Sequence, residues 1–382
     1  MGNLESKGAE IPRRKLVCLA GLPIDVITQT QALDAILAAI RERRRLFLST
    51  PNLNFMIAAQ ADASFRDSIL HSDLSVADGT SLVLLAKLLG CKLPERVTGS
   101  DLFEQLARGT SHPPVKVFFF GGPAGAGAKA AERIRQEFPG VVCVGHDEAG
   151  FGDVASMSTQ ATIDRINASG ADMVVVALGA KKGQAWLMHN RHRLHAPVIS
   201  HLGAVINFMA GTVRRSPKWL QNLGLEWVWR ISQEPTLWRR YRDDGSAFLS
   251  LLAHNVLGGA WLDLLRRLFE RAAQPAVITL HRVSGAHRTL ALSGDWSGTH
   301  VPELEDAIGD ALSAQLILQE ANSISPAVLG AIVGLHGQML RAGGAGISMG
   351  PCAPHIARQI RSMGADYLQM PQSTAPLLNQ EA

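Results

Sequence analysis

The sequence predicts an α/β protein in which parallel strands alternate with helices. Two observations lead to this prediction: short apolar runs recur between helical patterns from Lys15 onward, and each run leads into small or polar residues. The chain has 382 residues, of which 47% are hydrophobic and 18% charged, so it can bury a large core and suits two domains. This composition argues against a disordered chain.

The predicted core begins with strand-like runs at 15–26 and 45–50, separated by a helix from about Thr30 to Arg43. Further strands are predicted at 115–122, 141–146, 171–179 and 196–203. Ligands of parallel sheets bind at the carboxyl ends of the strands. Functional residues are therefore expected on the loops that follow these runs.

After Gly211 the chain becomes rich in tryptophan and arginine, which predicts a helical appendage, and a helical stretch from Phe248 to about Ala273 follows. A second α/β unit is predicted beyond Pro275. The expected division is a disordered extension at 1–15, an α/β core at 16–212, the appendage with its linker helix at 213–274 and a small α/β domain at 275–377.

The formal net charge of +4 and a pI near 9.0 indicate anionic partners such as nucleotides, lipid phosphates or a membrane surface, and no nucleic acid is expected. The four cysteines lie far apart without C-x-x-C spacing, which argues against a disulfide scaffold or a cysteine zinc site. The N-terminus lacks the long apolar region and cleavage site of a signal peptide, so a cytoplasmic location is expected.

Two segments place polar side chains at predicted loop positions. Thr50 and Asn52 flank Pro51 at a strand end, where they either line a cleft or form an N-cap and turn. Asp78 precedes Gly79 at a predicted helix start, where a carboxylate either accepts a proton or caps the helix. The residues alone leave both alternatives open.

Six motifs occur in order at predicted loops: Thr50-Pro51-Asn52, Val76-Ala77-Asp78-Gly79, Arg96-Val97-Thr98-Gly99-Ser100-Asp101-Leu102, Phe120-Gly121-Gly122, Leu178-Gly179-Ala180 and Leu225-Glu226-Trp227. Together they resemble the WecG/TagA/CpsF family of bacterial glycosyltransferases, glycosyltransferase family 26, over roughly residues 16–241. The resemblance implies a Rossmann-like parallel-sheet core and a protein held peripherally at the inner face of the cell membrane.

The resemblance implies transfer of a hexose or N-acetylhexosamine-type sugar, with inversion, from a UDP-sugar to a polyprenyl-diphosphate-linked saccharide in exopolysaccharide or cell-surface polymer synthesis. It implies that Asp78 is the general base, with Thr50 and Asn52 beside it. Substrate contacts are expected from Gly79, Gly99, Ser100, Asp101, Gly121, Gly122, Gly179, Ala180, Lys181 and Gln184.

Arginines are expected to offset the charge of the leaving diphosphate. No D-x-D metal motif occurs in this chain, so no metal is expected, and no cofactor beyond the donor substrate. Arg230 and Arg240 match family arginines, and a guanidinium suits a diphosphate, although a solvated helix face is an equal alternative for each. The resemblance also implies that the appendage meets the membrane, with exposed tryptophans, the alternative being a tryptophan-rich core.

Two departures from the family pattern motivate a different class of function. Where the family reads Gly-Ala-Pro-Lys-Gln-Glu, this chain has Lys181, Gly183 and Gln184 in place of the proline, the glutamine and the glutamate. Gln184 or Lys181 would then have to serve the donor. Leu237 replaces a third arginine. The alternative is a catalytically impaired scaffold of the same pathway.

Other motifs are weaker. A G-x-G-x-x-A match at 125–130, with Asp147 beyond it, suggests a nicotinamide site, but the preceding strand already ends at Gly121. The histidines at 189–195 lack the spacing of a metal site and suit a solvated helix face. Residues 275–377 resemble a STAS domain. That pattern has an Asp-Ser pair whose serine can be phosphorylated, and here Ser325 and Pro326 stand in its place. A docking module for a protein partner is therefore expected.

Overall fold

The computed structural model describes residues 14–150, 152–217, 219–220, 225–253 and 274–369. Its centre is a six-stranded sheet in the order β4-β3-β8-β7-β5-β6, with every neighbouring pair parallel. The strands are β3 (Leu46–Ser49), β4 (Leu74–Ser75), β5 (Val115–Gly121), β6 (Val141–Asp147), β7 (Met173–Ala177) and β8 (Val198–His201). The predicted α/β class and Rossmann-like core are thereby confirmed.

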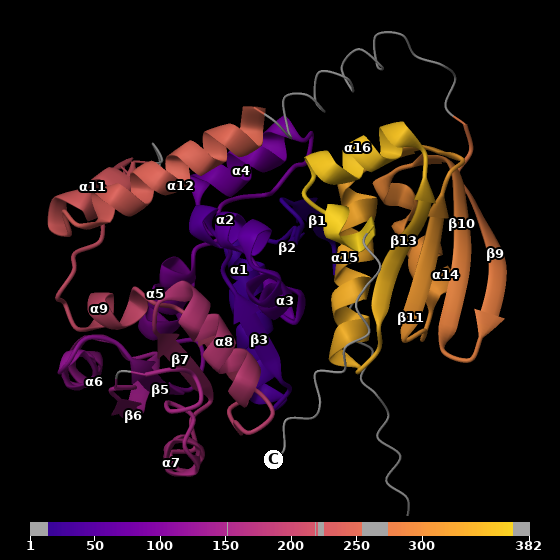
Figure 1. Ribbon diagram of the computed structural model, residues 1–382. Helices are drawn as coiled ribbons and strands as arrows, with labels where there is room; N and C mark the ends of the chain where they lie inside the picture. The colour runs from indigo at the N-terminus through magenta and orange to yellow at the C-terminus, as the bar shows by residue number, and fades with distance from the viewer. Residues whose placement is uncertain (1–13, 151, 218, 221–224, 254–273, 370–382) are drawn as a thin grey trace, which may run out of the picture.

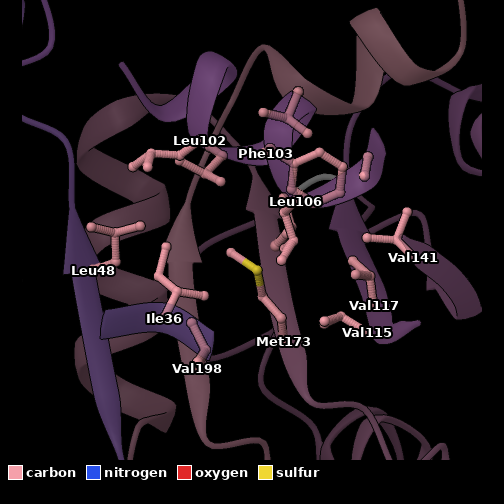
Figure 2. Close-up of a cluster of buried hydrophobic side chains, with 14 of the residues drawn as sticks. Ile36, Leu48, Leu102, Phe103, Leu106, Val115, Val117, Val141, Met173 and Val198 are labelled. Carbon is pink, nitrogen blue, oxygen red and sulfur yellow. The ribbon is translucent and has the colours of Figure 1, made fainter. Parts of the chain in front are cut away.

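Alternating residues of these strands pack on opposite faces of the sheet. On one face, Val117 and Met173 pack against the apolar sides of α1, α5, α6 and α9, part of which Figure 2 shows. On the other face, Phe118 and Val174 pack against α7 and α8. These helices are α1 (Gln29–Arg41), α5 (Gly99–Arg108), α6 (Ala126–Glu137), α7 (Gln160–Ala168), α8 (Ala180–Asn190) and α9 (Val205–Met209).

The apolar run at 15–26 forms an antiparallel hairpin rather than a strand of the main sheet. Its strands are β1 (Leu16–Leu19) and β2 (Leu22–Asp25), and Ala20 and Gly21 between them have φ values of 50° and 78°. The hairpin packs with α2 (Leu53–Ala61), α3 (Ala63–Leu70) and α4 (Thr80–Leu88) around a separate apolar cluster.

The C-terminal residues build a second sheet, in which β10 and β11 are parallel, as are β11 and β13, while β9 joins β10 antiparallel. Its elements are β9 (Val277–Ser284), β10 (His287–Trp296), β11 (Ser313–Leu318), β12 (Ala321–Ile324), β13 (Gly346–Cys352), α14 (Val301–Ile308), α15 (Pro326–Arg341) and α16 (Pro354–Ser362), with short 3-10 turns at 298–300 and 366–369. Helix α15 lies between this sheet and the hairpin (Figure 1).

Glycines allow α15 to approach the hairpin closely. A Cβ on Gly330 would lie 2.6 Å from Val17 Cα, and one on Gly334 would overlap the Leu16 side chain. Arg341 at the end of α15 donates a hydrogen bond of 2.9 Å to the Leu70 carbonyl oxygen. The second sheet is therefore joined to the core by close packing as well as by the chain.

Two helices of the appendage are α11 (Glu226–Gln233) and α12 (Leu237–Leu251); α12 lies beside α2 and α4, and α11 contacts α12 (Figure 1). Most of the expected linker helix, at 254–273, lies outside the described residues, as do residues 1–13 of the expected N-terminal extension. Among the described helices, none is long and apolar enough to span a membrane.

Candidate active site

A cavity of about 920 Å³ opens at the carboxyl ends of β3, β4, β7 and β8, and α11 and α12 form its other wall. Ten of the predicted site residues line it: Thr50, Asn52, Asp78, Gly79, Gly99, Ser100, Gly179, Ala180, Arg230 and Arg240. The strand order explains this convergence, because β4, β3, β8 and β7 are consecutive neighbours in the sheet.

Asp78 follows β4 and is partly buried at the cavity wall. Its backbone N–H donates to the Pro51 carbonyl oxygen at 2.8 Å, and its Oδ2 accepts from the Gly99 N–H at 3.3 Å. The N-cap of α4 is Gly79, and that cap makes no side-chain hydrogen bond, so Asp78 is not the cap of this helix. The carboxylate is directed toward the next loop instead.

The pKa of Asp78 is raised to about 7, mainly by burial and to a smaller extent by the nearby Glu226 carboxylate. The Gly99 N–H and the Arg96 guanidinium act in the opposite direction. A carboxyl with this pKa is partly ionised at neutral pH, which matches the requirement for a general base.

The other residues of the predicted pocket support this geometry. Asn52 caps α2, because its Oδ1 accepts from the Phe55 N–H at 3.2 Å, yet it also lines the cavity. Thr50 is 5% exposed and lies against Gly99, where a Cβ would come within 3.1 Å of the Thr50 methyl group. Thr50, Gly99 and Asp78 are therefore packed as one unit.

Two arginines reach the cavity from the appendage. Arg230 lies on α11, and its buried Nε has no hydrogen-bond partner among the described residues. Arg240 lies on α12, half-exposed, with Nε 3.7 Å from Asp244. An unsatisfied guanidinium nitrogen beside a cavity can bind an anion.

The remaining five predicted residues do not line the cavity. Asp101 pairs with Arg215 at 2.6 Å, and Lys181 pairs with Asp62 at 3.1 Å. Gln184 is buried and donates to Ser49 Oγ at 3.0 Å, which directs its amide into the core. Gly121 and Gly122 have positive φ values and pack against Leu178 and Ile206.

Arg96, His201, Tyr241 and Asp244 are among the cavity-lining residues that were not predicted as site residues. Arg96 stands in one of the motifs, and its Nη1 donates to Glu226 Oε2 at 2.9 Å, joining the core to α11. His201 ends β8 and Asp244 lies on α12, in segments whose sequence patterns indicate only a strand and a helix.

The G-x-G-x-x-A segment does not line this cavity. Gly125 is the N-cap of α6 and donates to Glu148, while a Cβ on Gly127 would contact the His146 ring. Gly127 therefore serves close packing between α6 and β6, while Gly125 has a φ of 73° at the helix start. Among the described residues, no group of three or more histidine, cysteine or acidic side chains is placed to hold a metal ion.

Comparison with known proteins finds related transferases. A protein named N-acetylglucosaminyldiphosphoundecaprenol N-acetyl-beta-D-mannosaminyltransferase, from Bacillus spizizenii, is 29% identical over 213 residues, which is 56% of this chain and 81% of the relative. One of the same name from Bacillus subtilis is 28% identical over 193 residues, 50% of this chain and 73% of the relative.

The profile of the glycosyl transferase WecG/TagA/CpsF family matches residues 17–261, more than half of the chain, and this range includes most of β1, the whole main sheet and helices α11 and α12. The chain therefore belongs to the WecG/TagA/CpsF family of glycosyltransferases.

Proposed function

We propose that the protein is an inverting, metal-independent glycosyltransferase that moves a hexose or N-acetylhexosamine-type sugar from a UDP-sugar to a polyprenyl-diphosphate-linked acceptor. One observation carries this proposal: Asp78, with a pKa of about 7, opens on the same cavity as the unpartnered Nε of Arg230. A base and a cation on one cavity are what direct displacement of a diphosphate requires.

In this proposal Asp78 takes the proton of the acceptor hydroxyl, and the oxygen attacks the anomeric carbon of the donor. The new glycosidic bond forms as the bond to the UDP oxygen breaks, so the electron pair leaves with the diphosphate. Attack from the side opposite the leaving group inverts the anomeric centre. The transferred proton converts the Asp78 carboxylate into a neutral carboxylic acid.

Arg230 and Arg240 would stabilise the negative charge that develops on the leaving diphosphate. Leu237 occupies the position of a third arginine in the family pattern and also lines the cavity. In this proposal two guanidinium groups stabilise the leaving diphosphate, where the family pattern has three.

The proposal places this reaction at the inner face of the cell membrane, in exopolysaccharide or surface-polymer synthesis. The names of both relatives include a sugar linked through a diphosphate to undecaprenol. In the appendage Trp219, Trp227 and Trp238 are 62%, 46% and 46% exposed, and α11 has no buried residue. Tryptophans and arginines on one exposed element suit the interface of an anionic bilayer.

We also propose that residues 275–377 are a STAS-like docking domain for a protein partner. The exposed edge of the second sheet supports this, because Leu280 and Val283 on β9 are 53% and 58% exposed. A photoreactive amino acid at Leu280 is expected to crosslink one defined protein in cells, while the same group at the exposed Asp310 does not.

The experiment that tests the enzymatic proposal is a transfer assay with a panel of UDP-sugars and a polyprenyl-diphosphate-linked acceptor, comparing the wild type with Asp78→Asn. Turnover of at least one donor by the wild type, and loss of it in Asp78→Asn, is expected. Absence of both turnover and nucleotide binding in the wild type would favour the alternative of a scaffold acting through its C-terminal domain.

A further inference from the structure

Gly183 and His201 are in direct contact beside the cavity. Gly183 lies in the first turn of α8, and His201 is the last residue of β8. A Cβ on Gly183 would overlap His201 Cδ2 and would lie 3.0 Å from both Cγ and Nε2. The His201 ring thus occupies the space that a side chain at position 183 needs. Position 183 is where the family pattern carries glutamine.

The ring is held in one orientation and one tautomer. Nε2 of His201 lies 2.6 Å from the Leu178 carbonyl oxygen, and because a carbonyl oxygen only accepts, Nε2 carries the proton. Burial lowers the pKa of His201, so the imidazole is neutral near neutral pH and Nδ1 is an acceptor. Nδ1 has no donor among the described residues.

The free nitrogen is on the side of the ring away from α8. The Cδ2 edge of His201 faces Gly183, and Nδ1 lies on the other side of the ring, while the residue itself lines the cavity. A fixed, neutral acceptor in this position can recognise a ligand N–H or O–H group.

The strand order separates His201 from Asp78 along the cavity. Strand β8 is two places from β4, after which Asp78 follows, and two inter-strand spacings are on the order of 10 Å. The acceptor hydroxyl must lie within hydrogen-bond reach of Asp78. A group this far along the same cavity is placed to meet the other substrate, the sugar nucleotide.

We propose that His201 is a donor-binding residue whose Nδ1 accepts a hydrogen bond from an N–H or O–H group of the sugar nucleotide, in place of the glutamine absent at Gly183. This inference rests on the proposed function. Gly183 and His201 then form a coupled pair: the glycine leaves room for the histidine ring, and the histidine supplies the contact with the donor.

Two matched substitutions separate ligand binding from a structural role. His201→Gln keeps an Nε2–H group at the same number of bonds from the backbone, and so retains the bond to Leu178 while losing the Nδ1 acceptor. His201→Asn places Oδ1 at the position of Nδ1 and loses the bond to Leu178. Affinities for UDP and for a UDP-N-acetylhexosamine are measured by calorimetry, with thermal unfolding as a check of the fold.

The proposal predicts that His201→Gln weakens binding about tenfold or more, whereas His201→Asn stays within about threefold of the wild type. Weakening with UDP itself assigns the contact to the uridine; weakening only with the sugar nucleotide assigns it to the sugar. The reverse order, with Asn more damaging than Gln, overturns the proposal. Failure of the wild type to bind either compound overturns the proposed function and this inference with it.

The coupling is tested by a double-mutant cycle. Gly183→Ala is expected to weaken donor binding about tenfold in the wild type, because the new methyl group displaces His201. In a His201→Gly background the same substitution is expected to change binding by less than about twofold. An equal loss in both backgrounds contradicts the proposed pair.

Discussion

Arg96 donates a hydrogen bond of 2.9 Å to Glu226, which joins the loop beside Asp78 to helix α11 of the appendage. The two charges act on Asp78 with opposite sign, since Glu226 raises its pKa and Arg96 lowers it. Glu226→Gln is therefore expected to move the acidic limb of the pH–rate profile to lower pH, and Arg96→Gln to higher pH.

The control for this pair is Glu104→Gln, which removes a carboxylate that pairs with Arg215 outside the cavity. Its profile should coincide with that of the wild type. A shift in the same direction for both Glu226→Gln and Arg96→Gln would contradict the assignment of the limb to Asp78.

Asp78 should also make folding stability depend on pH. Its pKa of about 7 in the folded protein exceeds the value of about 3.9 in an unfolded chain. Between these values the folded state holds the extra proton, so the contribution of Asp78 to stability declines as pH rises from about 4 to about 7. Thermal unfolding should show Asp78→Asn gaining stability relative to the wild type across this interval. A constant difference between pH 4 and pH 8 would argue against the raised pKa.

Arg230→Ala is expected to lower kcat about 100-fold, because it removes a cation placed to stabilise the leaving diphosphate. Arg230→Lys should recover only part of the loss, since an ammonium lacks the guanidinium fork. The matched control is Arg239→Ala on α12, an exposed arginine that does not line the cavity. Equal effects of Arg230→Ala and Arg239→Ala would point to a general charge effect of the appendage.

Gly330→Ala should destabilise the protein although alanine is the better helix former. At an exposed helix position, replacing glycine by alanine raises the free energy of unfolding by about 1 kcal/mol. At position 330 the methyl group would lie 2.6 Å from Val17 Cα, which is too close. Gly245→Ala on α12, where no atom lies within 4 Å of the new methyl group, is the control and should raise the melting temperature. Stabilisation by both substitutions would show that α15 is not tightly packed on the hairpin.

Much of the core could be predicted from the sequence, because strands buried on both faces are continuous apolar runs such as residues 117–121 of β5 and Met173–Ala177. The hairpin at 15–26 was not distinguished from a main-sheet strand, since its turn depends on the positive φ values of Ala20 and Gly21. Strand order is set by packing between distant segments, and local periodicity does not encode it.

The candidate site was predictable where a side chain follows a strand and, among the described residues, forms no hydrogen bond or ion pair with a distant side chain that turns it away from the cavity, as with Asp78 and Thr50. Lys181 and Gln184 differ, because Asp62 and Ser49, more than a hundred residues away in the chain, direct their side chains away from the cavity. His201 was missed for the converse reason: its orientation depends on Leu178 and Gly183, which no local pattern connects with it.

The central claim, that Asp78 is the general base, is tested most directly by the pH dependence of kcat/KM for sugar transfer to a polyprenyl-diphosphate-linked acceptor. For the wild type, kcat/KM should rise tenfold per pH unit up to about pH 7 and then level off, and Asp78→Asn should be at least about 100-fold slower without this rise. An Asp78→Asn variant that keeps both the wild-type rate and the wild-type acidic limb would contradict the account.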